Sequence, residues 1–95
     1  KEDTCDLLYM DLNGQGHRIA DLSILGCSRP AIMAASPVTG DIFLIMHGPY
    51  RLFRITPAGD IKPIATEIFG DPWGMVVSPD GKWIYVAESG AIDKT

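Results

Sequence analysis

Short apolar runs alternate along the chain with clusters of Gly, Pro, Asn, Asp and Ser, which recur roughly every 8 to 12 residues. Runs rich in Ile, Val, Phe, Tyr and Leu between such turn signals are typical of an all-β protein. No window carries a sustained 3.6-residue stripe, and prolines interrupt each candidate helix. The pattern predicts eight strands, at about residues 6–12, 17–22, 31–36, 41–47, 50–56, 61–66, 73–78 and 82–88.

Two of these strands are almost continuously apolar, namely Ile42–Met46 and Ile84–Ala87. Runs of this kind suit central strands that are covered on both faces. The strand at 50–56 is mixed, and its two arginines, Arg51 and Arg54, suit an outer strand.

The sequence also repeats itself. The turn and strand that begin at Ser36 recur at Ser78, 42 positions later, and Gly16 and Gly59 are 43 positions apart. A period of about 40–45 residues filled with strands and turns is the signature of a β-propeller blade, which cannot bury its faces without neighbours. We therefore predict an all-β fold of four-stranded antiparallel propeller blades.

The composition limits the classes of partner. The chain has 95 residues, enough for one small domain, with 46% hydrophobic and 21% charged residues. Its net charge of −4 and its lack of a basic run argue against nucleic acid or an anionic membrane surface as a partner. No apolar stretch approaches the roughly 18 residues of a membrane span.

The two cysteines, Cys5 and Cys27, lack metal-ligand spacing and a recognisable catalytic partner motif. Two partly buried thiols are the favoured interpretation, and a disulfide is the alternative. The compartment stays open between these two cases. Reduced thiols fit a cytoplasmic protein, whereas a bridge fits a secreted or periplasmic one.

One segment carries a family resemblance. Residues 71–90, DPWGMVVSPDGKWIYVAESG, resemble the blade pattern of NHL-repeat proteins, the senescence-marker/gluconolactonase family and strictosidine-synthase-like proteins. Residues 51–60 resemble the strand pair that follows in those blades. The resemblance covers almost the whole chain, with a degraded first copy. It implies a propeller that usually has six blades, and many unrelated activities use this blade.

The resemblance also implies how the strands divide among blades within a single module spanning residues 1–95. Residues 5–22 are expected to form an outer half-blade, residues 31–66 a complete blade and residues 73–88 an inner half-blade. The chain would then hold about two blades and be completed by oligomerisation.

In the gluconolactonase-like enzymes, a divalent metal ligand sits between the Pro and the Gly of a turn. The position after Pro72 is Trp73 in this chain, and the position after Pro30 is Ala31. Neither side chain can bind a hard cation. We therefore expect no metal, no cofactor and no catalytic residue here, and the enzyme interpretation loses support.

The connections of the expected blades would gather five residues around one mouth of the central channel: Arg29, His47, Asp71, Trp73 and Glu88. An aromatic platform with acidic and basic groups could hold a sugar-like or small polar ligand. The alternatives are that Trp73 packs at the start of a blade, that Asp71 forms a turn, that His47 and Glu88 are solvated, and that Arg29 pairs with a neighbouring carboxylate.

Three functions are therefore in competition. The first is a β-propeller module that binds a ligand or a protein, with a candidate small-molecule site at the axial mouth. The second is an enzyme similar to the lactonases, esterases or strictosidine synthases. The third is a piece of a longer propeller whose function lies in other blades.

The strand order adds a prediction about self-association. The inner pair near the C-terminus of one chain complements the outer pair near the N-terminus of another. Such head-to-tail contacts close into a ring or continue as a fibre. Three chains would close six blades and four would close eight, and we expect the homotrimer.

Overall fold

The computed structural model describes residues 5–25, 30–46, 50–65 and 71–89. All eight predicted strands are present in this part of the chain, and a four-residue 3-10 helix follows the second strand. The elements are β1 (Asp6–Met10), β2 (Gly16–Asp21), η1 (Leu22–Leu25), β3 (Pro30–Ala35), β4 (Ile42–Met46), β5 (Arg51–Ile55), β6 (Ile61–Ala65), β7 (Asp71–Val77) and β8 (Ile84–Ser89).

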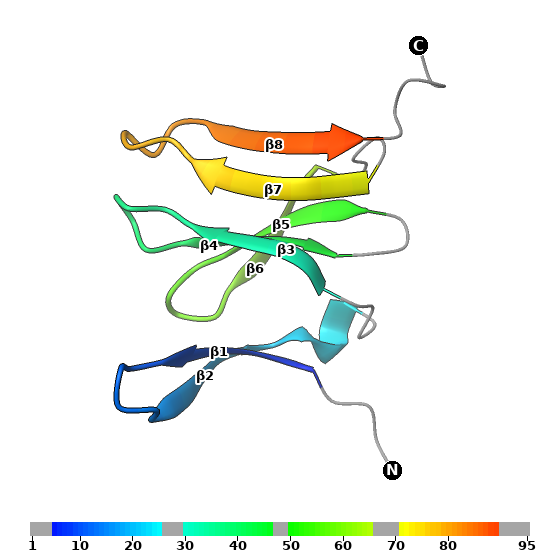
Figure 1. Cartoon of the computed structure of the whole chain (residues 1–95). Coiled ribbons are helices and arrows are strands. Elements are labelled where there is room, and N and C mark those ends of the chain that lie inside the picture. Colours follow the sequence, from blue (N-terminus) through cyan, green and yellow to red (C-terminus); the bar gives the residue numbers. More distant parts are fainter. Residues whose placement is uncertain (1–4, 26–29, 47–49, 66–70, 90–95) are drawn as a thin grey trace.

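The strands form three antiparallel sheets. β1 and β2 form one hairpin, β7 and β8 form another, and the remaining strands form a four-stranded sheet in the order β3-β4-β5-β6. Figure 1 shows the three sheets as layers, with the four-stranded sheet between the two hairpins. The chain is thus a small all-β domain, as the turn spacing predicts.

Two apolar clusters hold the layers together, one on each face of the four-stranded sheet. On one face, Leu44 and Ile55 pack with Leu7 and Leu22 of the first hairpin and its flanking helix. On the other face, Phe43, Ile45 and Leu52 pack with Met75 of β7. Full burial of such a side chain on folding stabilises the protein by about 1.5–3 kcal/mol. The middle sheet therefore carries most of the core.

The apolar runs of the two copies have different environments. β4 is covered on both faces, as predicted for a central strand. Within the single chain, Ile84–Ala87 is not covered in this way, because β8 is the edge strand of a two-stranded sheet and Tyr85 on its outer face is exposed. β5 is the third strand of its sheet, between β4 and β6, and its two arginines are exposed.

The turns follow from local side-chain chemistry. Ser36 Oγ accepts hydrogen bonds from the backbone N–H groups of Val38 and Thr39, at 3.1 and 3.2 Å. In the second copy, Ser78 Oγ accepts from the backbone of Lys82 and Trp83, at 3.2 and 3.1 Å. Serine hydroxyls commonly close turns in this way. The repeated Ser-Pro pair thus closes a turn of the same length in both units of the repeat, but the positive-φ glycine lies four residues after Ser36 and three residues after Ser78.

The structure shifts the register of the other repeat. Gly14 and Gly59 both have positive φ, at 90° and 97°, and each donates its N–H to the carbonyl oxygen three residues earlier. The equivalent of Gly59 is therefore Gly14 and not Gly16, so the β1–β2 and β5–β6 hairpins are 45 positions apart rather than 43.

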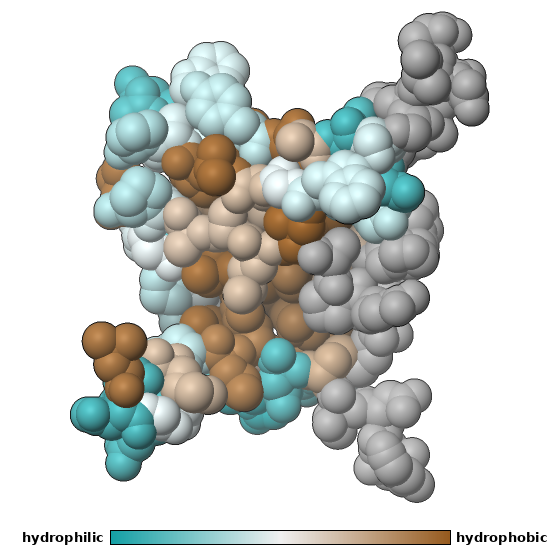
Figure 2. Space-filling model, in the orientation of Figure 1, coloured by the Kyte–Doolittle hydropathy of each residue, from teal (hydrophilic) through white to brown (hydrophobic). Residues whose placement is uncertain are grey.

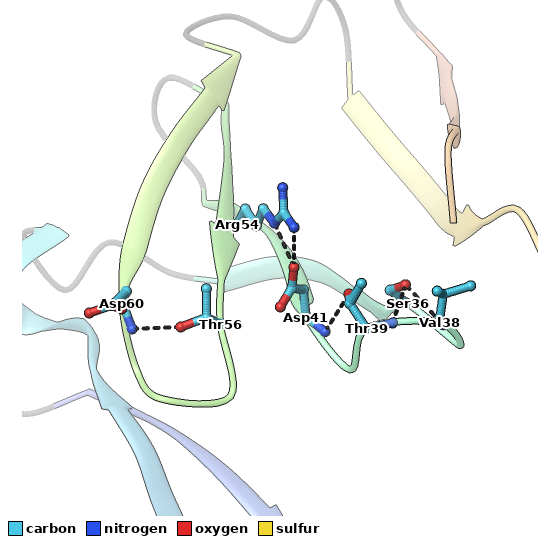
Figure 3. Close-up of polar contacts among 7 residues, drawn as sticks. All are labelled: Ser36, Val38, Thr39, Asp41, Arg54, Thr56 and Asp60. Carbon is cyan, nitrogen blue, oxygen red and sulfur yellow. Dashed lines mark hydrogen bonds and ion pairs between the residues drawn. The ribbon is translucent and has the colours of Figure 1, made fainter. Parts of the chain in front are cut away.

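A buried carboxylate connects the β3–β4 turn to β5. Asp41 is buried, and its Oδ2 accepts from Nε of Arg54 at 2.6 Å and lies 2.5 Å from Nη2 (Figure 3). The backbone N–H of Asp41 donates to Thr39 Oγ1 at 3.2 Å. In the next hairpin, the N–H of Asp60 donates to Thr56 Oγ1 at 3.1 Å.

The first cysteine is disulfide-bonded, which overturns the favoured interpretation of two thiols. Cys5 also accepts a backbone hydrogen bond from the N–H of Leu22 at 2.8 Å, which ties the start of β1 to the 3-10 helix. The second cysteine, Cys27, lies outside the described residues.

Candidate functional site

Three of the five residues predicted for the axial mouth are described, and they lie together at one end of the last hairpin. Asp71 is the first residue of β7, and Glu88 is the penultimate residue of β8. Trp73 sits at a register shift between Pro72 and Gly74. The other two predicted residues, Arg29 and His47, lie outside the described part of the chain.

Trp73 does not pack into the core at the start of the last hairpin. It is 73% exposed, and its indole N–H donates a hydrogen bond to Ser89 Oγ on β8. A bulge opposes two residues of one strand to one of the other and so re-aims the side chain. The bulge at Trp73 thus presents the indole to solvent while Ser89 limits its rotation.

Asp71 connects the last hairpin to the middle sheet. Its Oδ1 accepts a hydrogen bond from the Tyr50 hydroxyl at 3.3 Å, and Tyr50 directly precedes β5. Asp71 is paired with Ser89 in the β7–β8 ladder and is therefore a strand residue, not the turn former that was the alternative.

Glu88 is exposed and lies opposite Pro72 in the same ladder. This end of the hairpin therefore carries two carboxylates and an exposed aromatic ring, and carboxylates accept hydrogen bonds from hydroxyl or ammonium groups. The ion pairs of the described residues, Asp6–Arg18 and Asp41–Arg54, lie elsewhere.

Sequence reasoning missed Tyr50 and Ser89. Tyr50 is the first residue of the predicted strand at 50–56, and an aromatic residue at the start of a strand is a weak signal for a partner two strands away. Ser89 lies opposite Asp71 in the ladder, a neighbourhood that only the β7–β8 register reveals.

Two aspartates outside the mouth have lowered pKa values. A hydrogen bond from the Ser23 hydroxyl lowers the pKa of Asp21, helped by the Ser23 backbone N–H. The Ser78 hydroxyl similarly lowers the pKa of Asp80, helped by the N–H of Lys82. Both carboxylates thus accept local hydrogen bonds from residues two positions away in the chain.

Among the described residues, no group of three or more His, Cys, Asp or Glu side chains is placed to hold a metal ion. The expectation that the mouth holds no divalent cation stays a prediction. No helix within the described ranges is long and apolar enough to cross a membrane.

An apolar hollow lies away from this end of the last hairpin. A cavity of about 400 Å³ opens between the first hairpin and strands β3 and β4 of the middle sheet. Apolar side chains dominate its lining, which includes Leu7, Leu8, Leu22, Ile32, Met33 and Leu44. Figure 2 shows hydrophobic side chains gathered on this face between β3 and β1. A second, shallower depression covers the outer face of β7–β8.

Three comparisons were made, with protein-family models, with curated proteins and with solved structures. No family model, no curated protein and no solved structure matches the chain.

Proposed function

We propose that this chain is a β-propeller module that binds a small polar ligand at the end of the last hairpin. Three features support the propeller. The sheets are layered face to face, a serine-closed turn recurs 42 positions apart, and β3 lies beside β7, so that the first strands of two successive sheets are neighbours. Propeller blades stack in this manner around an axis.

One observation carries the ligand site: an exposed tryptophan is fixed by a hydrogen bond on a strand pair that also carries two carboxylates. The Trp73 indole is held by Ser89, and Asp71 and Glu88 lie on the same two strands. An exposed ring of restricted mobility can stack against a ligand. The hydrogen bond made by the indole N–H lowers the free-energy cost of leaving the ring exposed to water.

The two carboxylates decide the class of ligand. Sugar hydroxyls donate hydrogen bonds to carboxylates, while the face of the sugar ring that carries C–H groups stacks on an indole. We therefore propose a mono- or disaccharide as the ligand. Binding here needs no nucleophile, base or metal.

The test uses the fluorescence of Trp73. Because the chain has two tryptophans, Trp83→Phe leaves Trp73 as the sole indole. Titration of this variant with glucose, xylose and cellobiose should shift or quench its emission with a saturable dependence for at least one sugar.

Calorimetry with the same sugars then compares Trp73→Ala with a matched control, Trp83→Ala. Both tryptophans are exposed, but Trp83 lies at the opposite end of the hairpin. Trp73→Ala should weaken binding by about 1–3 kcal/mol, and Trp83→Ala should leave it unchanged. Emission that no sugar alters, or equal losses in both variants, would overturn the proposal.

A further inference from the structure

Equivalent positions of the repeat differ in burial in a systematic way. Phe43 of β4 is 7% exposed, whereas its equivalent 42 positions later, Tyr85 of β8, is 58% exposed. Phe43 faces the last hairpin, and Tyr85 points away from the middle sheet. The same face of the sheet is thus covered in the first unit of the internal repeat and exposed in the second.

The outer strands show the converse. Ile55 of β5 is 0% exposed, and its equivalent 45 positions earlier, Met10 of β1, is 60% exposed. Leu8 is likewise exposed where its equivalent, Phe53, is buried. Both Phe53 and Ile55 are covered by the first hairpin, and among the described residues no sheet covers β1 in the same way.

The inner strands complete the pattern. Met75 of β7 is buried against the middle sheet, and its equivalent, Met33 of β3, is exposed and lines the large cavity. The cavity also borders β1, whose ladder partner in the described sheets is β2. It therefore occupies the place that a preceding inner hairpin would fill.

We propose that the β7–β8 hairpin of a second copy of this chain occupies this cavity, with its β8 pairing along β1 to complete a four-stranded sheet. The inference deepens the proposed propeller and rests on it. The outer face of this β7–β8 hairpin, with Val76 and Tyr85, would cover Met33 and Leu44 of the first copy. Within one chain, Ala34 and Phe43 pack against the Met75 cluster in the same way.

The occupant is a copy of this hairpin because the intramolecular interface already shows how it docks. The contact of the middle sheet with β7–β8 would simply continue onto the next chain. Both bare surfaces are apolar, and burial of matched apolar faces drives association. An unpaired edge strand on each side adds main-chain hydrogen bonds.

The register follows from the middle sheet, where Leu44 lies opposite Phe53 and Phe43 opposite Arg54. Transferred by the 42- and 45-residue offsets, this register places Val86 of one copy opposite Leu8 of the next. The same transfer places Tyr85 opposite Tyr9.

At the end of this ladder Glu88 would face Asp6. Nη1 of Arg18 lies 3.4 Å from Asp6 Oδ1 and supplies a cation beside both carboxylates.

A contact of this kind is head-to-tail, so it closes into a ring or continues as a fibre. Each chain contributes strands for two blades. Three copies would close the six-bladed ring that the sequence resemblance implies.

Engineered cysteines test the contact. In one chain β1 and β8 belong to the two outer layers, so a bond between them must join two molecules (Figure 1). The double variant Leu8→Cys/Val86→Cys should form covalent oligomers on mild oxidation. The control Leu8→Cys/Ala87→Cys should not, because neighbouring strand residues point to opposite faces. The wild-type chain, oxidised in parallel, controls for its native cysteines.

The mass of the unmodified chain in solution provides a second measurement that does not depend on the variants folding. Association that rises with concentration, together with cross-linking of the matched pair alone, supports the inference. A monomer at all concentrations, or equal cross-linking of matched and control pairs, overturns it. Neither result bears on the Trp73 titration, so the ligand proposal fails or holds separately.

Discussion

The middle sheet and the last hairpin are built from the same repeat but have different surroundings. β4 has hairpins on both sides and buries Phe43, Leu44, Ile45 and Met46. β8 carries the corresponding apolar run, yet Tyr85 lies on an open face. This apolar run therefore specifies a strand with two apolar faces, while the neighbouring layers decide whether both faces are buried.

The largest expected effect contrasts a buried position with its exposed equivalent. Ile55→Ala removes a fully buried side chain and should lower the free energy of unfolding by about 2–5 kcal/mol. Met10→Ala, at the equivalent position of β1, should change the free energy of unfolding by less than about 0.5 kcal/mol at low protein concentration. Urea unfolding at low protein concentration measures both. Equal losses would contradict the difference in environment.

The next contrast is between two ion pairs. Asp41→Ala leaves Arg54 without its carboxylate and removes a buried group, so we expect a loss of about 1–3 kcal/mol. Asp6→Ala breaks the exposed pair with Arg18 in the first hairpin and should cost less than about 1 kcal/mol. Chemical denaturation in low and high salt compares them, and only the Asp6 pair should weaken with salt. A larger loss for Asp6→Ala would show that the buried pair contributes little.

Two equivalent glycines provide a finer contrast between the sheets. Both Gly14 and Gly59 have positive φ, so alanine should cost about 1–2 kcal/mol at either site. At Gly59, an added Cβ would also lie 2.6 Å from the carbonyl oxygen of Ile19, whereas Gly14 faces open space. Gly59→Ala should therefore cost more than Gly14→Ala in thermal unfolding. Identical costs would mean that β2 does not approach the β5–β6 turn.

The smallest effect concerns pH. The Ser78 hydroxyl and the Lys82 N–H lower the pKa of Asp80 below its ordinary value of 3.8. The resulting stability is fully present above 3.8 and is lost as pH falls through the lower folded-state pKa. Unfolding curves between neutral and acidic pH should show a slightly smaller acid loss for Asp80→Asn than for wild type. An unchanged or steeper acid loss in Asp80→Asn would contradict this assignment.

Much of the fold is predictable from sequence because turn residues mark both ends of each strand. The eight strands appear within a few residues of the predicted bounds. The 43-residue offset is wrong because it matched Gly16 to Gly59 by residue type, whereas the turn requires positive φ at Gly14. Burial of β8 is not predictable from its letters alone, because it depends on a layer outside the local sequence.

The candidate site is predictable in part. The sequence places Trp73 and Glu88 on one predicted strand pair and Asp71 just before it, and the ladder brings all three to the same end. The exposure of Trp73 depends on a bulge, and the contact of Asp71 with Tyr50 depends on how the hairpin packs on the middle sheet. Neither feature has a local sequence signal.

The proposed contact would cover the bare faces of the two hairpins with other copies of the chain. Sedimentation equilibrium of the 95-residue chain at micromolar to submillimolar concentration tests it most directly. We predict a species of three times the chain mass that unfolds cooperatively, with a midpoint that rises with concentration. A folded, cooperative monomer across the whole range would contradict the account.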